Sequence, residues 1–320
     1  MFAATRMGLL QNSGGMLPQS KELTSIGRQD FVGVACSADG VKVSVIVNNG
    51  YLYTSNNSGE TWVERTSAGR RAWRCITSSA DGMKLAAAWN GGYIQTSIDG
   101  GATWIERSNT LSGGWQSIAS SSDGLKLVAA SSTSYIYTSS DGGATWIART
   151  SAPRGLWSRV TSSMDGAKLA ATMRNGYIYT SSDGGATWIA RTSAGKRLWE
   201  AISMSADGAK LAAGTAFYYS ETRNIHTSTD NGVTWSVRTS AGIGEWRSIA
   251  SSTDGMKLVA GDMGNNVHIS YDGGISWTPI VTAGKRFWWS VACSAAGTVI
   301  FACVITSNEN RNGGSIWRIS

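Results

Sequence analysis

The sequence contains little proline, cysteine or histidine. Its 320 residues include 3 Pro, 4 Cys and 2 His. So little proline excludes a collagen-like or proline-rich filament. Four cysteines without a CxxC spacing exclude a disulfide scaffold and a zinc finger. Two histidines, His226 and His268, are too few for a metal site without a third ligand, so we expect no metal and no cofactor.

Long apolar runs are also absent. The longest apolar stretches have the length of a strand, which excludes a membrane-spanning helix. Arg6 interrupts the opening MFAATRMGLL, so we expect a soluble chain without a signal peptide. The compartment and the oligomeric state, monomer or larger, stay open. The 28 Lys and Arg exceed the 21 Asp and Glu and give a net charge of +7, which favours acidic partners.

The sequence does contain a repeat of about 42 residues. Three elements keep one register along the chain: an aromatic residue, the string SxDGxK, and the string SxDxGxTW. The last string ends at Trp62, Trp104, Trp146, Trp188, Trp235 and Trp277. The aromatic residues are Phe31, Trp73, Trp115, Trp157, Trp199, Trp246 and Trp288. The string SxDGxK occurs six times, and its seventh copy, SAAGTVIFA from Ser294, lacks the Asp. This periodicity indicates seven repeats of one structural unit.

Each repeat predicts four short strands separated by Gly, Asn and Asp turns, and no helical period occurs. We therefore predict an all-β fold, a single seven-bladed β-propeller of four-stranded antiparallel blades over residues 1–320. The final segment, Ser315–Ser320, aligns with a third strand, so we expect residues 16–23 to complete the last blade and close the ring. Residues 1–15 would form an irregular extension. The insertions AFYYSETRN and SNENRNGG would enlarge loops between second and third strands.

The string SxDxGxTW resembles the Asp-box of sialidase-like (BNR repeat) propellers. That resemblance implies a turn-building role rather than catalysis for its acids, which are Asp99, Asp141, Asp183, Asp230 and Asp272. The chain is also similar to the photosystem II assembly-factor propellers, which share this fold and an arginine-rich face. These resemblances imply two alternative functions, an assembly or scaffolding factor and a sialidase-like glycoside hydrolase.

The two faces of the predicted ring differ in charge. Turns between strands one and two and between strands three and four lie on one side of a blade, so this side would carry the Asp-rich turns. The connections RTSAGxRxW would lie on the other side and make it basic. We assign Arg71, Arg154, Arg197 and Arg286 to a ligand-binding face, together with the arginines that begin these connections, namely Arg65, Arg107, Arg149, Arg191 and Arg238. Arginine favours carboxylate, sulfate or phosphate.

The repeated tryptophans of the first strands have two interpretations. Trp73, Trp115, Trp157, Trp199, Trp246 and Trp288 could pack as wedges between blades, or form an aromatic platform beside the basic face. We expect His226 and His268 to fill third-strand positions that hold Tyr or Gln in other blades. Outside the turns no evident pair of acids occurs, although folding could bring Glu200 near Glu245, so we name no catalytic residue.

We therefore expect a non-enzymatic binding propeller. Its partner would be an anionic glycan, which would make the protein lectin-like, or an acidic protein surface. The motifs that nucleic-acid binding would need are absent.

Overall fold

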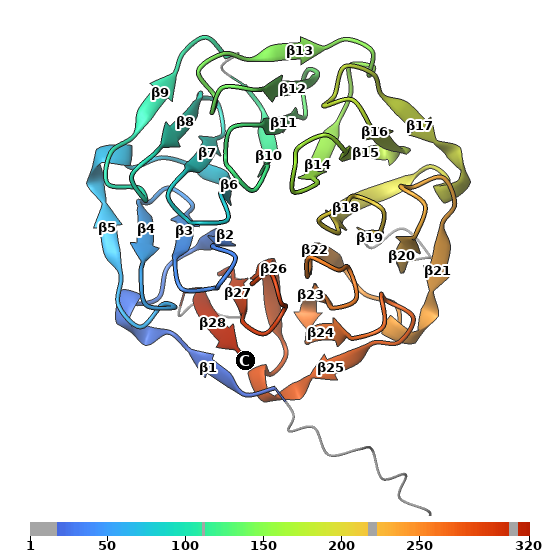
Figure 1. Cartoon of the computed structure of the whole chain (residues 1–320). Helices are drawn as coiled ribbons and strands as arrows, with labels where there is room; N and C mark the ends of the chain where they lie inside the picture. The colour runs from blue at the N-terminus through green and yellow to red at the C-terminus, as the bar shows by residue number, and fades with distance from the viewer. Residues whose placement is uncertain (1–17, 111–112, 217–222, 307–312) are drawn as a thin grey trace, which may run out of the picture.

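The computed structural model describes residues 18–110, 113–216, 223–306 and 313–320. In these segments the strands form three four-stranded antiparallel sheets and two eight-stranded ones, and no α-helix occurs. Each eight-stranded sheet consists of two four-stranded units joined by a short antiparallel pairing, at Arg174 with Leu198 and at Met263 with Phe287. The resulting seven four-stranded units lie around a ring (Figure 1). Five short 3-10 turns are present: Thr24–Ile26, Thr66–Ala68, Thr192–Ala194, Thr239–Ala241 and Val281–Ala283. No helix of this described part has the length and apolarity that crossing a membrane would require. The all-β prediction is confirmed.

The units follow one another along the chain. Blade 1 contains β2 (Phe31–Cys36), β3 (Val43–Val47), β4 (Leu52–Ser55) and β5 (Val63–Arg65). Blade 2 contains β6 (Trp73–Ser78), β7 (Leu85–Trp89), β8 (Ile94–Ser97) and β9 (Ile105–Arg107). Blade 3 contains β10 (Trp115–Ser120), β11 (Leu127–Ser131), β12 (Ile136–Ser139) and β13 (Ile147–Arg149). Blade 4 contains β14 (Trp157–Ser162), β15 (Leu169–Gly176), β16 (Ile178–Ser181) and β17 (Ile189–Arg191).

The remaining units have the same order. Blade 5 contains β18 (Arg197–Met204), β19 (Leu211–Thr215), β20 (Ile225–Ser228) and β21 (Ser236–Arg238). Blade 6 contains β22 (Trp246–Ser251), β23 (Leu258–Asn265), β24 (Val267–Ser270) and β25 (Thr278–Ile280). Blade 7 contains β26 (Arg286–Cys293), β27 (Ile300–Val304) and β28 (Ser315–Ile319), and its outer position is held by β1 (Ser20–Glu22).

The last blade is assembled from both ends of the described chain. Strand β1 runs antiparallel to β28, with Ser20 opposite Ile319 and Glu22 opposite Trp317. The backbone N–H of Leu23 donates to the carbonyl of Ile316 at 2.8 Å, next to this pairing. The segment that we expected to supply the fourth strand of this blade, residues 16–23, therefore contains β1, which pairs with the third strand, β28. Residues 1–15, Met16 and most of the two insertions lie outside the described residues.

Backbone hydrogen bonds connect neighbouring blades on the side of the SxDGxK turns. Each turn donates one N–H to the carbonyl of the equivalent residue in the next blade. The bonds run from Ala38 to Ala80, Ser122, Met164, Ala206, Thr253 and Ala295, and then from Ala295 back to Ala38, with lengths of 2.7–2.8 Å. Lysines of the same turns add contacts, as Lys126 Nζ does with the carbonyl of Asp165 at 2.8 Å. The turns thus fix each blade relative to its neighbours.

The SxDxGxTW turns are held together by their own side chains. Asp141 accepts the hydroxyl of Ser139, the backbone N–H of Thr145 and the hydroxyl of Thr145, at 2.8, 2.8 and 2.6 Å. Trp146 donates its indole N–H to the carbonyl of Gly143 at 3.0 Å. Gly143 has φ = +87°, a conformation that other residues rarely adopt. The same contacts recur at Asp99, Asp183 and Asp230, and at Asp272 with Ser276 in place of Thr, which supports a turn-building role.

The core lies between blades. Trp157 packs against β11 and β12 of the preceding blade and against Val160 and Leu169 of its own blade. Its ring also meets Tyr179 edge to face, with the ring centroids 5.0 Å apart. Propeller blades need such contacts because each sheet covers the face of the next. The first strand of each blade lies nearest the centre of the ring (Figure 1). Residues of these seven strands line a central cavity.

Candidate functional site

A β-bulge recurs at the start of every first strand. Its register shift lies between Trp73 and Cys75 in blade 2, and at the equivalent place in the other six blades. A bulge turns the extra residue out of the normal alternation, and bulges are frequent beside functional sites. The seven extra residues are of six types, with arginine occurring twice: Val32, Arg74, Gln116, Ser158, Glu200, Arg247 and Trp289. A backbone feature that recurs in every blade therefore presents side chains of different chemistry around the ring.

One central cavity is lined by residues of all seven first strands. Its volume is ≈ 200 Å³, and its polar lining includes Arg74, Gln116, Arg159 and Trp289. We call this cavity, with the charged residues Arg174, Glu200, Glu245 and Arg247 near it, the arginine-rich channel.

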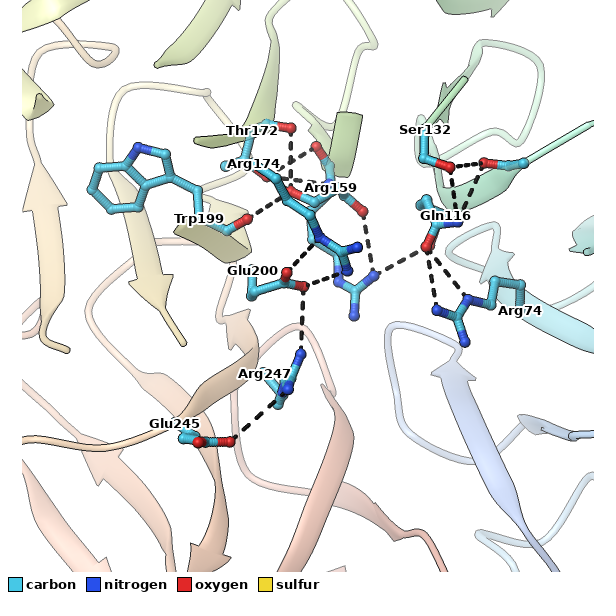
Figure 2. Close-up of polar contacts among 12 residues, drawn as sticks. Arg74, Gln116, Ser132, Arg159, Thr172, Arg174, Trp199, Glu200, Glu245 and Arg247 are labelled. Carbon is cyan, nitrogen blue, oxygen red and sulfur yellow. Dashed lines mark hydrogen bonds and ion pairs between the residues drawn. The ribbon is translucent and has the colours of Figure 1, made fainter. Parts of the chain in front are cut away.

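Two buried glutamates are held by arginines of the arginine-rich channel (Figure 2). Arg174 binds both carboxylate oxygens of Glu200, at 2.5 and 3.1 Å. Arg247 lies between the two acids, 3.7 Å from an oxygen of Glu200 and 3.9 Å from an oxygen of Glu245. Arg223 also reaches Glu245, at 3.7 Å. Only 1% of Glu200 is exposed, so these ion pairs compensate the cost of burying its charge.

Two other arginines of the channel lack such compensation. Arg159 donates to the backbone carbonyls of Gln116 and Ser158, at 3.2 and 3.3 Å. Arg74 reaches the side-chain oxygen of Gln116 at 3.4 Å (Figure 2). Among the described residues, neither arginine has a carboxylate within 4.0 Å. Burial lowers the pKa of Arg159 from its ordinary value, and the charges of Arg74 and Arg174 lower it further against the opposing effect of Glu200.

The four arginines that we predicted for the basic face lie in the connections between blades. Three of them cover aromatic rings: Arg71 lies 4.7 Å from the Trp89 ring, Arg154 5.7 Å from Tyr135, and Arg286 4.4 Å from Trp317. Trp89 is the last residue of β7 and Tyr135 directly precedes β12, whereas Trp317 lies within β28. The first two contacts bring the connection between blades next to the connection between second and third strands, so both kinds of connection share one face.

Other contacts limit what these arginines can offer a ligand. Arg71 also has an exposed ion pair with Glu106 at 3.6 Å, and Arg197 donates Nε to the carbonyl of Ala194 at 3.2 Å. Cation–π contact leaves a guanidinium edge free for an anion, but it fixes the plane of the group.

The six repeated tryptophans are buried. Trp73 and Trp115 are 1% exposed, and Trp157, Trp199, Trp246 and Trp288 are fully covered. A covered ring cannot stack on a ligand, so the aromatic-platform interpretation is wrong for this structure and the packing interpretation holds. The aromatic residue that lines the channel is instead the half-buried Trp289, whose ring lies 5.2 Å from the guanidinium of Arg247.

The arginines that begin the RTSAGxRxW connections also lie elsewhere than we predicted. The Nε of Arg149 donates to the hydroxyl of Thr138 at 2.6 Å, which directs the side chain back along the blade. Arg149 consequently shares a groove with Lys126 and Asp183, which belong to the Asp-turn side. Arg65, Arg107, Arg191 and Arg238 make the same contact with a threonine. This group therefore does not belong to the basic face.

The two histidines occupy the positions that we expected. His226 meets Trp199 edge to face with centroids 5.0 Å apart, and His268 meets Trp246 at 5.1 Å. Tyr137 and Tyr179 do the same in their blades. Burial lowers the pKa of His226 to about 4, with a smaller contribution from the charge of Arg197. The histidines thus serve as neutral packing groups at neutral pH.

Solved structures with this architecture identify the fold. No protein-family model and no curated protein matches the chain. A structure of YCF48 bound to D1 peptide has a TM-score of 0.70 and 14% identity, covering 96% of this chain and 97% of that one. YCF48 from Cyanidioschyzon merolae also has a TM-score of 0.70, with 17% identity over 94% and 98% of the two chains. The chain is a propeller similar to YCF48.

The same architecture occurs in enzymes. A GH74 xyloglucanase from Xanthomonas campestris has a TM-score of 0.57 and 13% identity, and the match covers 90% of this chain and 65% of that enzyme's chain. Identities this low show the fold alone. They confirm the resemblance to assembly-factor propellers at that level, while the likeness to sialidase-like propellers stays a prediction.

Sequence reasoning missed most of the arginine-rich channel. Glu200 and Glu245 were anticipated as neighbours, and Arg247 does lie between them. The missed signal was the residue after each first-strand aromatic, which changes from Val to Arg, Gln, Ser, Glu, Arg and Trp while its surroundings repeat. What this arrangement can do chemically is bind anions, because it presents guanidinium groups in a partly enclosed channel.

Proposed function

We propose that the chain is a non-enzymatic binding propeller that holds an acidic segment of a protein partner in the arginine-rich channel, as an assembly or scaffolding factor would. The observation that carries this proposal is the pair Arg74 and Arg159, which line the channel without a carboxylate partner among the described residues. Glutamate, aspartate or a terminal carboxylate would supply the missing negative charge.

The asymmetry of the channel favours a protein segment over a glycan at this place. Its seven bulge residues include one acid, two arginines, one amide and one indole. A single site lined by different side chains suits a peptide, whose side chains have a defined order. A glycan of repeated sugar units would instead suit a site whose lining residues repeat. The YCF48 structure that shares this fold is bound to a peptide, which supports a peptide as the kind of ligand.

Catalysis is the weaker alternative. Glycoside hydrolysis by two acids needs one protonated carboxyl group and one ionised group. Glu200 and Glu245 are both paired with Arg247, and each has a second arginine, so the two acids have similar surroundings rather than the two different ones that this chemistry requires. We therefore expect no turnover of a fluorogenic sialoside or of xyloglucan. Measurable turnover by the wild-type chain would instead favour an enzyme.

We also infer that β1 closes the ring. The pairing of β1 with β28 supports this inference, as does the hydrogen bond from Ala295 to Ala38 between the last and first blades. A closed ring would keep the seven first strands at fixed separations and so preorganise the channel.

Binding of a short acidic peptide tests the proposed function. The probe is a fluorescent decapeptide rich in Glu and Asp with a free carboxyl terminus, measured by anisotropy at low and high salt. We expect the double variant Arg74→Gln, Arg159→Gln to weaken binding about tenfold or more while the melting temperature stays unchanged. The matched control is the quadruple reversal of Arg71, Arg154, Arg197 and Arg286 to Glu. If only the control weakens binding, the connections and not the channel are the site.

A further inference from the structure

A second kind of site recurs on the side opposite the basic face. Four grooves between neighbouring blades have the same construction, between blades 1 and 2, 2 and 3, 3 and 4, and 5 and 6. Each is lined by a lysine of the SxDGxK turn, an arginine at the end of the outer strand, and an aspartate of the next blade. In the largest groove, whose volume is ≈ 330 Å³, these residues are Lys126, Arg149 and Asp183. We call these the inter-blade pockets.

The arginine of each pocket is held in place but is not neutralised. Arg149 is half-buried, and its Nε is bound to Thr138 at 2.6 Å. Among the described residues no carboxylate lies within 4.0 Å of it. The same holds for Arg65, Arg107, Arg191 and Arg238. A fixed guanidinium that keeps its terminal N–H groups free is a preorganised receptor for a carboxylate.

The other walls of the pocket restrict the ligand further. Lys126 and Arg149 face one carboxylate, Asp183, so the pocket has one surplus positive charge. Asp183 would repel a doubly charged phosphate, but it can accept a ligand hydroxyl. Thr138 and Ser140 add hydroxyl groups, and Leu127 and Ile147 supply an apolar wall; Ile147 is 55% exposed. A singly charged ligand with several hydroxyls and an apolar face fits this combination.

We propose that the inter-blade pockets bind a carboxylate-bearing monosaccharide, such as a uronic acid unit, with its carboxylate on the arginine. The contacts of the lysine and arginine also occur between blades 4 and 5, at Lys168 and Arg191, which gives five equivalent sites. Blade 6 ends instead in Ile280, and blade 7 has no arginine at that position, so these grooves would not bind. Repeated walls suit a ligand that is itself repeated or displayed in many copies.

The arginine Nε–H groups report binding directly. Because each one is bound to a threonine hydroxyl, its resonance should be observable in a ¹⁵N spectrum of the intact protein. Titration with methyl β-D-glucuronide should shift five such resonances with dissociation constants on the order of millimolar. Methyl β-D-glucoside, which has a hydroxymethyl group in place of the carboxylate, should shift them at least about tenfold less at equal concentration.

Variants and an inorganic anion complete the test. Arg149→Gln should abolish binding in one pocket and leave the other four resonances shifting as before. The matched control, Arg154→Gln on the basic face, should leave all five unchanged. Equal shifts with the glucoside, or no shift with the glucuronide, would overturn the proposal. Equal shifts with sulfate would show a general anion site and would overturn the saccharide assignment. Peptide binding by the channel does not enter this experiment, so the two proposals can fail separately.

Discussion

Ala295 donates its backbone N–H to the carbonyl of Ala38 at 2.7 Å, and this bond joins the seventh blade to the first. The two residues occupy equivalent turns at opposite ends of the repeat array. The outer strand of the seventh blade comes from the N-terminal side, as β1. Stability of the whole ring should therefore depend on a segment of a few residues.

Removing residues 1–23 should lower the melting temperature markedly. The deletion removes β1 and the buried side chain of Leu23, which packs with Phe31 and Ile316. It leaves the third strand of blade 7 as an uncovered edge. Circular dichroism melts measure the effect, and deletion of residues 1–17 serves as the control because it spares β1. Equal melting temperatures for the two truncated chains would show that β1 does not close the ring.

Replacing Trp157 by Ala should destabilise the fold by about 3–5 kcal/mol, because the indole is fully covered and its loss leaves a cavity. Urea unfolding of the purified variant measures this free energy. Leu156→Ala is the matched control, since Leu156 is 51% exposed and should cost little. Similar stabilities for the two variants would contradict the wedge role of the first-strand tryptophans.

Acid should destabilise the protein through His226. Its pKa is about 4 in the folded protein and about 6.5 when unfolded, so the unfolded chain takes up the proton more readily. The contribution of neutral His226 to the free energy of unfolding is fully present above pH 6.5. It falls by about 2–3 kcal/mol as the pH decreases towards 4.

His226→Tyr removes this titration and copies the residue found in blades 3 and 4. The difference in unfolding free energy between wild type and variant should change between pH 7 and pH 4.5. A constant difference over this range would show that His226 is not the titrating group.

Glu200→Gln should cost about 3–5 kcal/mol of stability, because it leaves Arg174 and Arg247 without the charge that compensates them in a buried place. The control is Glu106→Gln, whose ion pair with Arg71 is exposed and should contribute about 0–1 kcal/mol. Urea unfolding compares the two variants. A cost for Glu200→Gln no larger than that of the control would show that the network does not stabilise the channel.

The fold was predictable because the same turn motifs and strand pattern occur in each of the seven repeats. The turn acids such as Asp141 make local contacts with residues two and four positions away, so their role follows from the motif alone. The pairing of β1 with β28 was predictable from alignment, since Ser315–Ser320 matches a third strand.

The site was less predictable because the direction of a side chain depends on individual hydrogen bonds and on strand register, which the repeat pattern does not specify. Arg149 and Arg154 are five residues apart, yet a bond to Thr138 turns Arg149 towards the Asp-turn side while Arg154 covers Tyr135. The bulge that exposes Arg74 to the channel is a change of register, which composition and spacing do not encode.

The most direct test of the account follows the indole N–H of Trp289 during titration with the acidic decapeptide. Trp289 lines the channel beneath Arg247, whereas Trp146 lies in an Asp turn on the other side. If the arginine-rich channel is the binding site, the Trp289 resonance shifts saturably with the binding isotherm and the Trp146 resonance does not move. Peptide binding with an unchanged Trp289 resonance would contradict the account.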